Sequence, residues 1–70
     1  MTDPITIIVN GEERAIASDA SLLDLLGDLE LDPRTVVVEL NREIVRRPAL
    51  ADTRLQSGDR VELVHFVGGG

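Results

Sequence analysis

The chain has 70 residues and a mass of 7.6 kDa, which is enough for one domain with one small core. It has no Cys and a single His, which excludes disulfides, zinc–thiolate sites, iron–sulfur clusters and a histidine-rich metal site within one chain. Seven Arg against thirteen Asp and Glu give a net charge of −6. We therefore expect neither nucleic-acid nor membrane partners, because phosphate groups and anionic lipids would repel the chain.

The N-terminal segment predicts a β-hairpin. Ile5–Val9 is rich in β-branched residues, a composition typical of a largely buried strand. Asn10 and Gly11 follow, and this pair favours a two-residue hairpin turn because both residues tolerate positive φ. Residues 12–17 then predict the returning strand, with Ala15 and Ile16 on opposite faces.

A short helix is predicted after the hairpin. Ser21 is a suitable N-cap, and Asp24 places negative charge in the first turn, where the helix dipole favours it. The following leucines have the i, i+3, i+4, i+7 spacing that forms one apolar stripe: Leu22, Leu25, Leu26 and Leu29. We expect the helix to end at Asp32–Pro33, because the residue before a proline disfavours helical geometry.

The second half of the chain predicts three more strands. They are residues 36–40, residues 43–45 after a turn at 41–42, and residues 60–67 after a turn at 57–59. The polar connection 48–57 is expected to contain one helical turn near Leu50. No internal repeat or linker divides the chain, so the elements are expected to share one core.

This order of elements predicts an α+β fold, with a mixed sheet of four to five strands and one main helix packed on one face. It resembles the β-grasp (ubiquitin-like) fold, in which the first and last strands pair in parallel at the centre of the sheet. We expect residues 1–67 to form this domain and residues 68–70 to form a flexible glycine tail. With no apolar run of membrane-spanning length and no signal peptide, we expect a cytoplasmic protein.

The glycine tail is the strongest candidate for a functional site. The catalytic motifs that we considered, a Walker loop, a GxGxxG loop and a nucleophile elbow, do not occur, and His65 is expected to be structural or surface-exposed. The α-carboxylate of Gly70 becomes electrophilic if its oxygen attacks the α-phosphate of ATP, which gives an acyl-adenylate. Gly68 and Gly69 have no Cβ and would let the tail thread a narrow channel in a partner. An inert glycine-rich end is the alternative.

The last predicted strand adds a candidate docking surface. Alternation places Val61 and Leu63 on one face, and Glu62, Val64 and Phe66 on the other. Because Glu62 does not suit a core, we expect Val64 and Phe66, with Val67 beside them, to contact a partner. A register shift of one residue would instead place Phe66 in the core.

The sequence resembles the ThiS family, the sulfur carriers of thiamine biosynthesis, along essentially its whole length. The segments that carry the resemblance are Ile5–Val9 with Asn10-Gly11, the helix around Leu22–Leu26, the strand Val36–Asn41 and the ending Gly58–Gly70. The last of these is the most specific, because its final glycines correspond to the family's diglycine.

The resemblance implies that the chain is a carrier and co-substrate, not itself an enzyme, with no permanently bound cofactor. An E1-like enzyme of the ThiF type would use Mg-ATP to adenylate Gly70. Sulfur from a cysteine desulfurase or rhodanese-like donor would displace AMP and leave a C-terminal thiocarboxylate, and a ThiG-type thiazole synthase would accept that sulfur. The alternatives are the small subunit of molybdopterin synthase, a sulfur carrier for another pathway, a protein-modifying ubiquitin-like tag, and a non-catalytic β-grasp interaction module.

Overall fold

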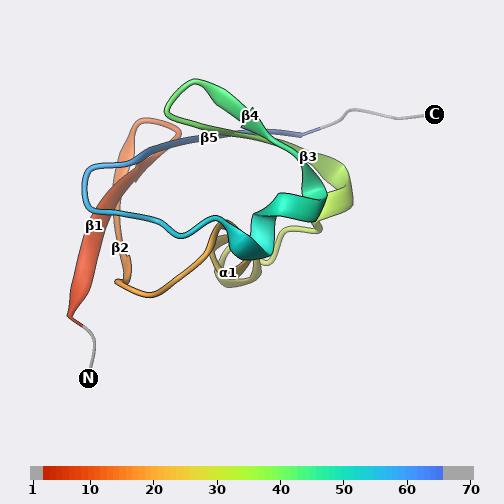
Figure 1. The fold of residues 1–70 in the computed structure, drawn as a ribbon. Coiled ribbons are helices and arrows are strands. Elements are labelled where there is room, and N and C mark those ends of the chain that lie inside the picture. Colours follow the sequence, from red (N-terminus) through yellow and green to blue (C-terminus); the bar gives the residue numbers. More distant parts are fainter. Residues whose placement is uncertain (1–2, 66–70) are drawn as a thin grey trace.

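The computed structural model describes residues 3–65, which form a five-stranded mixed sheet with one α-helix on one face (Figure 1). The sheet order is β2-β1-β5-β3-β4, in which β1 and β5 run parallel and the other neighbours are antiparallel. The predicted α+β, β-grasp class is confirmed, including the parallel pairing of the first and last strands. The elements are β1 (Pro4–Val9), β2 (Glu12–Ala17), α1 (Leu22–Asp28), η1 (Pro33–Thr35), β3 (Val36–Leu40), β4 (Glu43–Val45), η2 (Arg47–Asp52) and β5 (Arg60–His65).

Two tight turns with positive φ close the two hairpins. Asn10 and Gly11 have φ of 50° and 86°, as the sequence predicts for the turn between β1 and β2. Asn41 and Arg42 repeat this geometry between β3 and β4, with φ of 50° and 75°. Arg42 therefore occupies a conformation that is unfavourable for a residue with a Cβ atom.

The helix begins as predicted but ends earlier. Ser21 and Asp24 form a capping box: the Ser21 hydroxyl accepts from the Asp24 N–H at 3.1 Å, and the Asp24 carboxylate accepts from the Ser21 N–H at 2.9 Å. These bonds hold the pKa of Asp24 below its ordinary value, the backbone donor of Ser21 being the largest cause.

The predicted end at Asp32–Pro33 was wrong, because the helix stops at Asp28. Glu30 adopts φ of 59°, its N–H donates to the Gly27 carbonyl, and the Leu31 N–H donates to the Leu26 carbonyl. This is a Schellman motif with Glu in place of the usual glycine. Asp32 instead caps η1, where its carboxylate accepts from the Arg34 N–H at 2.9 Å.

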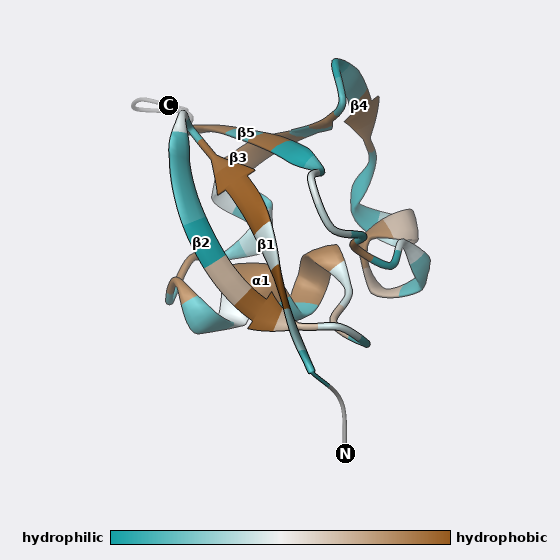
Figure 2. Cartoon of the chain, turned by 90° about the vertical axis from the view of Figure 1, so that its left-hand side faces the viewer, coloured by the Kyte–Doolittle hydropathy of each residue, from teal (hydrophilic) through white to brown (hydrophobic). Residues whose placement is uncertain are grey.

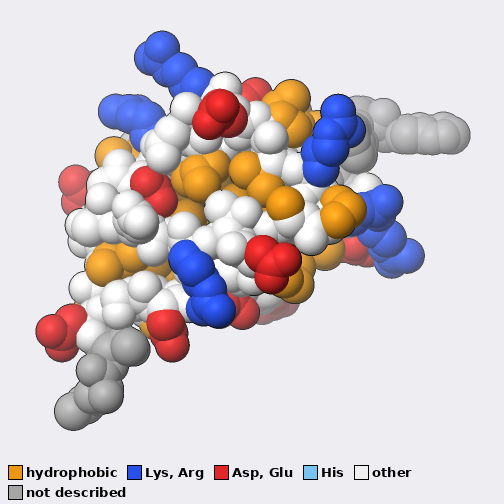
Figure 3. Space-filling view, in the orientation of Figure 1, with side chains coloured by type: hydrophobic (Ala, Val, Ile, Leu, Met, Phe, Trp, Pro, Cys, Tyr) orange, Lys and Arg blue, Asp and Glu red, His pale blue; other side chains and the backbone are white. Residues whose placement is uncertain are grey.

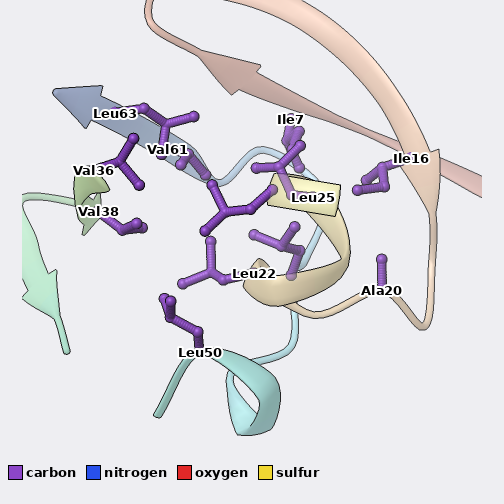
Figure 4. Packing of buried hydrophobic residues seen from close by; sticks show 12 residues of the cluster. Ile7, Ile16, Ala20, Leu22, Leu25, Val36, Val38, Leu50, Val61 and Leu63 are labelled. Atoms are coloured by element: carbon purple, nitrogen blue, oxygen red, sulfur yellow. The ribbon is translucent and has the colours of Figure 1, made fainter. Parts of the chain in front are cut away.

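The core lies between the sheet and α1 and is closed at one side by η2. Figure 4 shows Leu22 and Leu25 of α1 between the inner residues of the sheet and Leu50 of η2. Leu50, near which a helical turn was predicted, is only 2% exposed. The buried apolar side chains are Ile7, Ile16, Ala20, Leu22, Leu25, Leu26, Val36, Val38, Leu50, Leu55, Val61 and Leu63. Leu29, the fourth residue of the predicted stripe, is half-buried at the helix C-cap.

The sheet has one covered face and one open face (Figure 2). Along β5, Val61 and Leu63 are buried, whereas Glu62 and Val64 are exposed, so the predicted face assignment is confirmed for these residues. Within residues 3–65, no helix is long and apolar enough to cross a lipid bilayer.

Candidate functional site at the end of β5

The candidate site is the end of β5, the strand that leads to the C-terminal glycines. β5 is the middle strand of the sheet, between β1 and β3. It pairs with β3 along its length, from Leu40↔Val61 to Val36↔His65. The end of β5 is thus held in place on the β3 side as far as His65.

On the β1 side, a turn residue extends the pairing beyond the end of the strand. Strand β1 ends at Val9, and the Asn10 N–H donates to the Val61 carbonyl at 2.9 Å. The Asn10 side chain then reaches Leu63: its Oδ1 accepts from the Leu63 N–H at 2.8 Å, and its Nδ2 donates to the Leu63 carbonyl at 3.3 Å. The side-chain amide thereby takes the place of the next residue of a parallel strand and satisfies both backbone groups of Leu63.

A second asparagine holds the start of β5. The Asn41 N–H donates to the Arg60 carbonyl at 2.8 Å, and the Asn41 Oδ1 accepts from the Arg60 N–H at 3.0 Å. The Asn41 Nδ2 also donates to the Asp59 carboxylate at 3.1 Å. Each hairpin turn therefore binds the same central strand, one near its start and one near its end. The sequence predicted these asparagines as turn residues only, because both partners lie far away along the chain.

The outer face of β5 presents the predicted docking residue Val64. Its side chain is 57% exposed and lies directly across from Val37 of β3. Two residues along the ladder, on the same face, Glu62 lies opposite Glu39, so two like charges face each other. Ile44 of β4, 64% exposed, pairs with Glu39 on the other side. The open face thus combines apolar side chains with negative charge near the end of β5.

The other predicted site residues lie outside the described residues. These are Phe66 and Val67 of the docking surface and the tail residues Gly68, Gly69 and Gly70. His65, expected to be structural or exposed, is exposed at the last described position of β5. Among residues 3–65, no group of three or more His, Asp or Glu side chains is arranged to hold a metal ion.

Two hollows flank the site. One, of about 320 Å³, lies beside His65 and Leu63 and is bordered by Asn10, Arg14 and Leu31. The other, of about 480 Å³, lies under the β4 edge between η1 and η2 and carries three arginines, Arg34, Arg46 and Arg47. The sequence analysis missed this arginine groove, although the charge distribution signals it: residues 1–32 hold eight acids and one Arg, whereas residues 33–70 hold five acids and six Arg.

Arg34 in this groove forms an ion pair. Its guanidinium contacts the Asp32 carboxylate at 2.8 Å, with the Arg34 side chain largely exposed and the Asp32 side chain partly exposed. The side-chain hydrogen bond from Arg34 is the main cause that lowers the pKa of Asp32 to about 2. The same bond raises the pKa of Arg34.

Comparison with known proteins places this geometry in a family. The family model described as ThiS family matches residues 7–70. The sulfur carrier protein ThiS of Bacillus subtilis is 36% identical over 63 residues, which cover 89% of this chain and 96% of that protein. The crystal structure of the thiamine biosynthesis protein (ThiS) from Geobacter metallireducens superposes with a TM-score of 0.81 at 35% identity, and covers 94% of this chain and 100% of that one.

Longer proteins also contain a similar segment. A thiazole synthase of Paramagnetospirillum magneticum is 42% identical over 64 residues, and one of Magnetococcus marinus is 39% identical over 64 residues. The match covers 91% of this chain in both cases but only 20% of those proteins, so the chain spans about a fifth of their length. The family model matches nearly the whole chain, and the Bacillus subtilis relative is matched over almost its full length. The chain therefore belongs to the ThiS family.

Proposed function

We propose that this protein is a sulfur carrier in thiamine biosynthesis, in which the carboxylate of Gly70 carries the sulfur. An E1-like adenylyltransferase of the ThiF type transfers AMP from Mg-ATP to this carboxylate and releases pyrophosphate. The outer sulfur of a persulfide on a cysteine desulfurase or rhodanese-like donor attacks the acyl-adenylate and displaces AMP, which gives an acyl disulfide. A thiol then attacks the donor's sulfur in that bond, which releases the thiocarboxylate and leaves a disulfide on the donor. A ThiG-type thiazole synthase then takes the sulfur. The protein is a substrate in each step and not the catalyst.

The observation that carries this proposal is the family match, which extends through the last glycine, Gly70. The name of the Bacillus subtilis relative supports sulfur carriage. The thiazole synthases that contain a similar segment support thiazole synthase as the acceptor, since in those proteins the segment belongs to the same chain as the rest of the synthase.

The position of β5 supports a role in presenting the tail. Gly70 is five residues beyond His65, and five residues span at most about 17 Å, so a partner's catalytic centre must come within that distance of the domain. The paired backbone of β5 gives this tail a fixed origin, since Asn10 bonds Leu63 on one side of the strand and β3 pairs with the strand on the other. A fixed origin reduces the number of tail positions that a partner has to select.

The central test is intact-mass analysis. The protein is incubated with ATP, Mg²⁺, a matching E1-like enzyme and a sulfur donor. We expect a mass gain equal to the exchange of one oxygen for one sulfur, located in the C-terminal peptide. Deletion of Gly70, or addition of one residue after it, should abolish the gain while leaving the melting temperature unchanged. The absence of any gain with an E1-like enzyme that is active on another carrier would refute the proposal, and so would a gain in the extended variant.

A second test concerns docking through Val64, Phe66 and Val67. Val64→Asp should weaken binding to the E1-like enzyme with little loss of stability, because the side chain is 57% exposed. Ala15→Asp is the matched control, since it places the same charge on the same open face but on β2, away from the end of β5. Equal binding of the two variants in a titration would contradict the docking role of Val64. Phe66→Asp is expected to behave like Val64→Asp, and a large drop in its melting temperature would place Phe66 in the core.

A further inference from the structure

We propose that the arginine groove under β4 binds an extended acidic segment of a partner protein, which pairs with the backbone of Val36, the residue of β3 that β4 leaves uncovered. This groove borders the Val64 surface, because Val37 lines it and pairs with Val64, but the proposal does not depend on sulfur carriage. Its volume, about 480 Å³, lies within the range of specific ligand sites. In Figure 1, η1 and η2, which form its walls, lie with β3 and β4 at the end of the sheet toward which β5 runs.

The first argument is the unequal length of the two edge strands. Strand β4 pairs with β3 only from Leu40↔Glu43 to Val38↔Val45, and the chain then leaves the sheet at Arg46 to form η2. Strand β3 continues to Val36, paired with β5 alone in the part of the chain that the structure describes. Along a strand, successive residues direct their backbone groups to alternate neighbours. Val36 therefore directs its N–H and C=O toward the groove, as Val38 does toward β4.

The second argument is that the groove offers apolar contacts as well as a strand edge. Its walls include Val37 and Ile44 from the sheet and Pro48 from η2, and Leu50 contributes to the apolar floor. Ile44 is 64% exposed, one of the most exposed large apolar side chains of the described residues. A segment with alternating apolar residues would match this edge, since alternate side chains of an added strand point into the groove.

The third argument is charge, which selects an acidic segment. Arg34, Arg46 and Arg47 line a groove on a chain whose net charge is −6. Arg34 is partly neutralised by Asp32, and Arg47 also lies close enough to lower the pKa of that carboxyl. Arg46 and Arg47 are both exposed, and among residues 3–65 the ion pair found joins Arg34 to Asp32. Figure 3 shows both arginine and acidic side chains around a central group of apolar side chains. An acidic segment with an apolar centre is the complementary partner.

The test is a titration with a synthetic peptide, followed by amide NMR shifts of the full chain. The probe is the blocked peptide Glu-Val-Glu-Val-Asp-Val, and the comparison peptide has Lys in place of each acidic residue. We expect the acidic peptide to shift the amides of Val36, Val37 and Arg46, and the basic peptide to leave them unchanged. Binding should weaken several-fold between low and physiological ionic strength, because the charges are exposed to solvent.

Matched charge-reversal variants locate the site. The double variant Arg46→Glu and Arg47→Glu should weaken acidic-peptide binding at least tenfold. The double variant Arg42→Glu and Arg60→Glu makes the same change in net charge at the far end of β3 and β5, and should weaken binding less than threefold. Arg46→Ala with Arg47→Ala serves as a milder pair should the reversal lower the melting temperature.

Several outcomes would overturn the proposal. Equal loss of binding in both double variants would mean that net charge alone attracts the peptide. Shifts confined to β2 or α1 would place the binding elsewhere. If ATP shifted the same amide signals, or if the chain formed dimers at high concentration that displaced the peptide, the groove would have a different occupant. The titration does not involve Gly70, so its result is independent of the sulfur-transfer test.

Discussion

Replacement of Asn10 by Gly tests whether a turn side chain holds the strand that leads to the tail. The substitution removes the amide that pairs with Leu63 at 2.8 and 3.3 Å. It does not strain the turn, because Gly accepts the φ of 50° that Asn10 adopts. The change in stability therefore reports the lost side-chain bonds.

The expected cost follows from the two hydrogen bonds. Each contributes about 0.5–1.5 kcal/mol net, so Asn10→Gly should lower the free energy of unfolding by about 1–3 kcal/mol. For a domain of this size, a loss of about 2 kcal/mol corresponds to a fall in melting temperature of roughly 8–16 °C. The loss should also appear locally, as faster hydrogen exchange of the Leu63 amide.

Glu30→Gly is the matched control for this substitution. Glu30 has a similar φ of 59°, but it is exposed and its side chain forms no hydrogen bond within residues 3–65. Gly is the preferred residue at this position of a Schellman motif, so the control should raise the free energy of unfolding by about 0.5–1 kcal/mol. The two variants thus introduce the same residue at the same backbone conformation with opposite expected signs.

Urea unfolding of the wild-type protein and the two variants, at one temperature and with a shared m-value, measures the difference. A loss below about 0.5 kcal/mol for Asn10→Gly would mean that the amide contributes nothing net, since that is the lower end for one hydrogen bond. A change of the same sign in the free energy of unfolding of both variants would refute the reasoning, because backbone conformation alone would then explain both changes.

Three further predictions follow from the fold. Arg42→Gly should stabilise the protein by up to about 1 kcal/mol in urea unfolding, since Arg42 has φ of 75° in the second hairpin turn, and a destabilised variant would contradict this strain argument. Leu25→Ala should lower the free energy of unfolding by about 2–5 kcal/mol in the same urea measurement, because Leu25 is fully buried between the sheet and η2. A smaller loss would show that neighbouring side chains move in to fill the cavity. Because the pKa of Asp32 is lowered from 3.8 to about 2, its contribution to stability is complete above pH 3.8 and disappears as the pH falls through about 2. NMR titration of the Asp32 carboxyl should give that pKa, Asp32→Asn should lack this part of the acid dependence, and a titration midpoint near 3.8 would argue against the Arg34 ion pair in solution.

Local sequence signals were sufficient for most of the secondary structure and for the class of the fold. The Asn10-Gly11 turn, the Ser21 cap and the alternation of Val61 with Glu62 depend on interactions within a few residues of the chain. Such short-range preferences act in the same way in any context, so the order of strands and helix could be predicted, and with it the β-grasp fold. The resemblance to the ThiS family depended above all on the ending Gly58–Gly70, and the family match confirmed it.

Tertiary structure decided what short-range preferences leave open. The end of the helix was predicted from Asp32–Pro33, whereas packing of Leu31 against the core and the positive φ of Glu30 end it at Asp28. The bonds of Asn10 to Leu63 and of Asn41 to Arg60 join residues 53 and 19 positions apart, and the arginine groove brings Arg34 beside Arg46 and Arg47. The asparagine bonds exist only once β5 is inserted between β1 and β3, and the groove only once η1 and η2 pack beside β3 and β4. Long-range pairing of this kind leaves little mark on the local sequence, which is why the sequence alone did not reveal it.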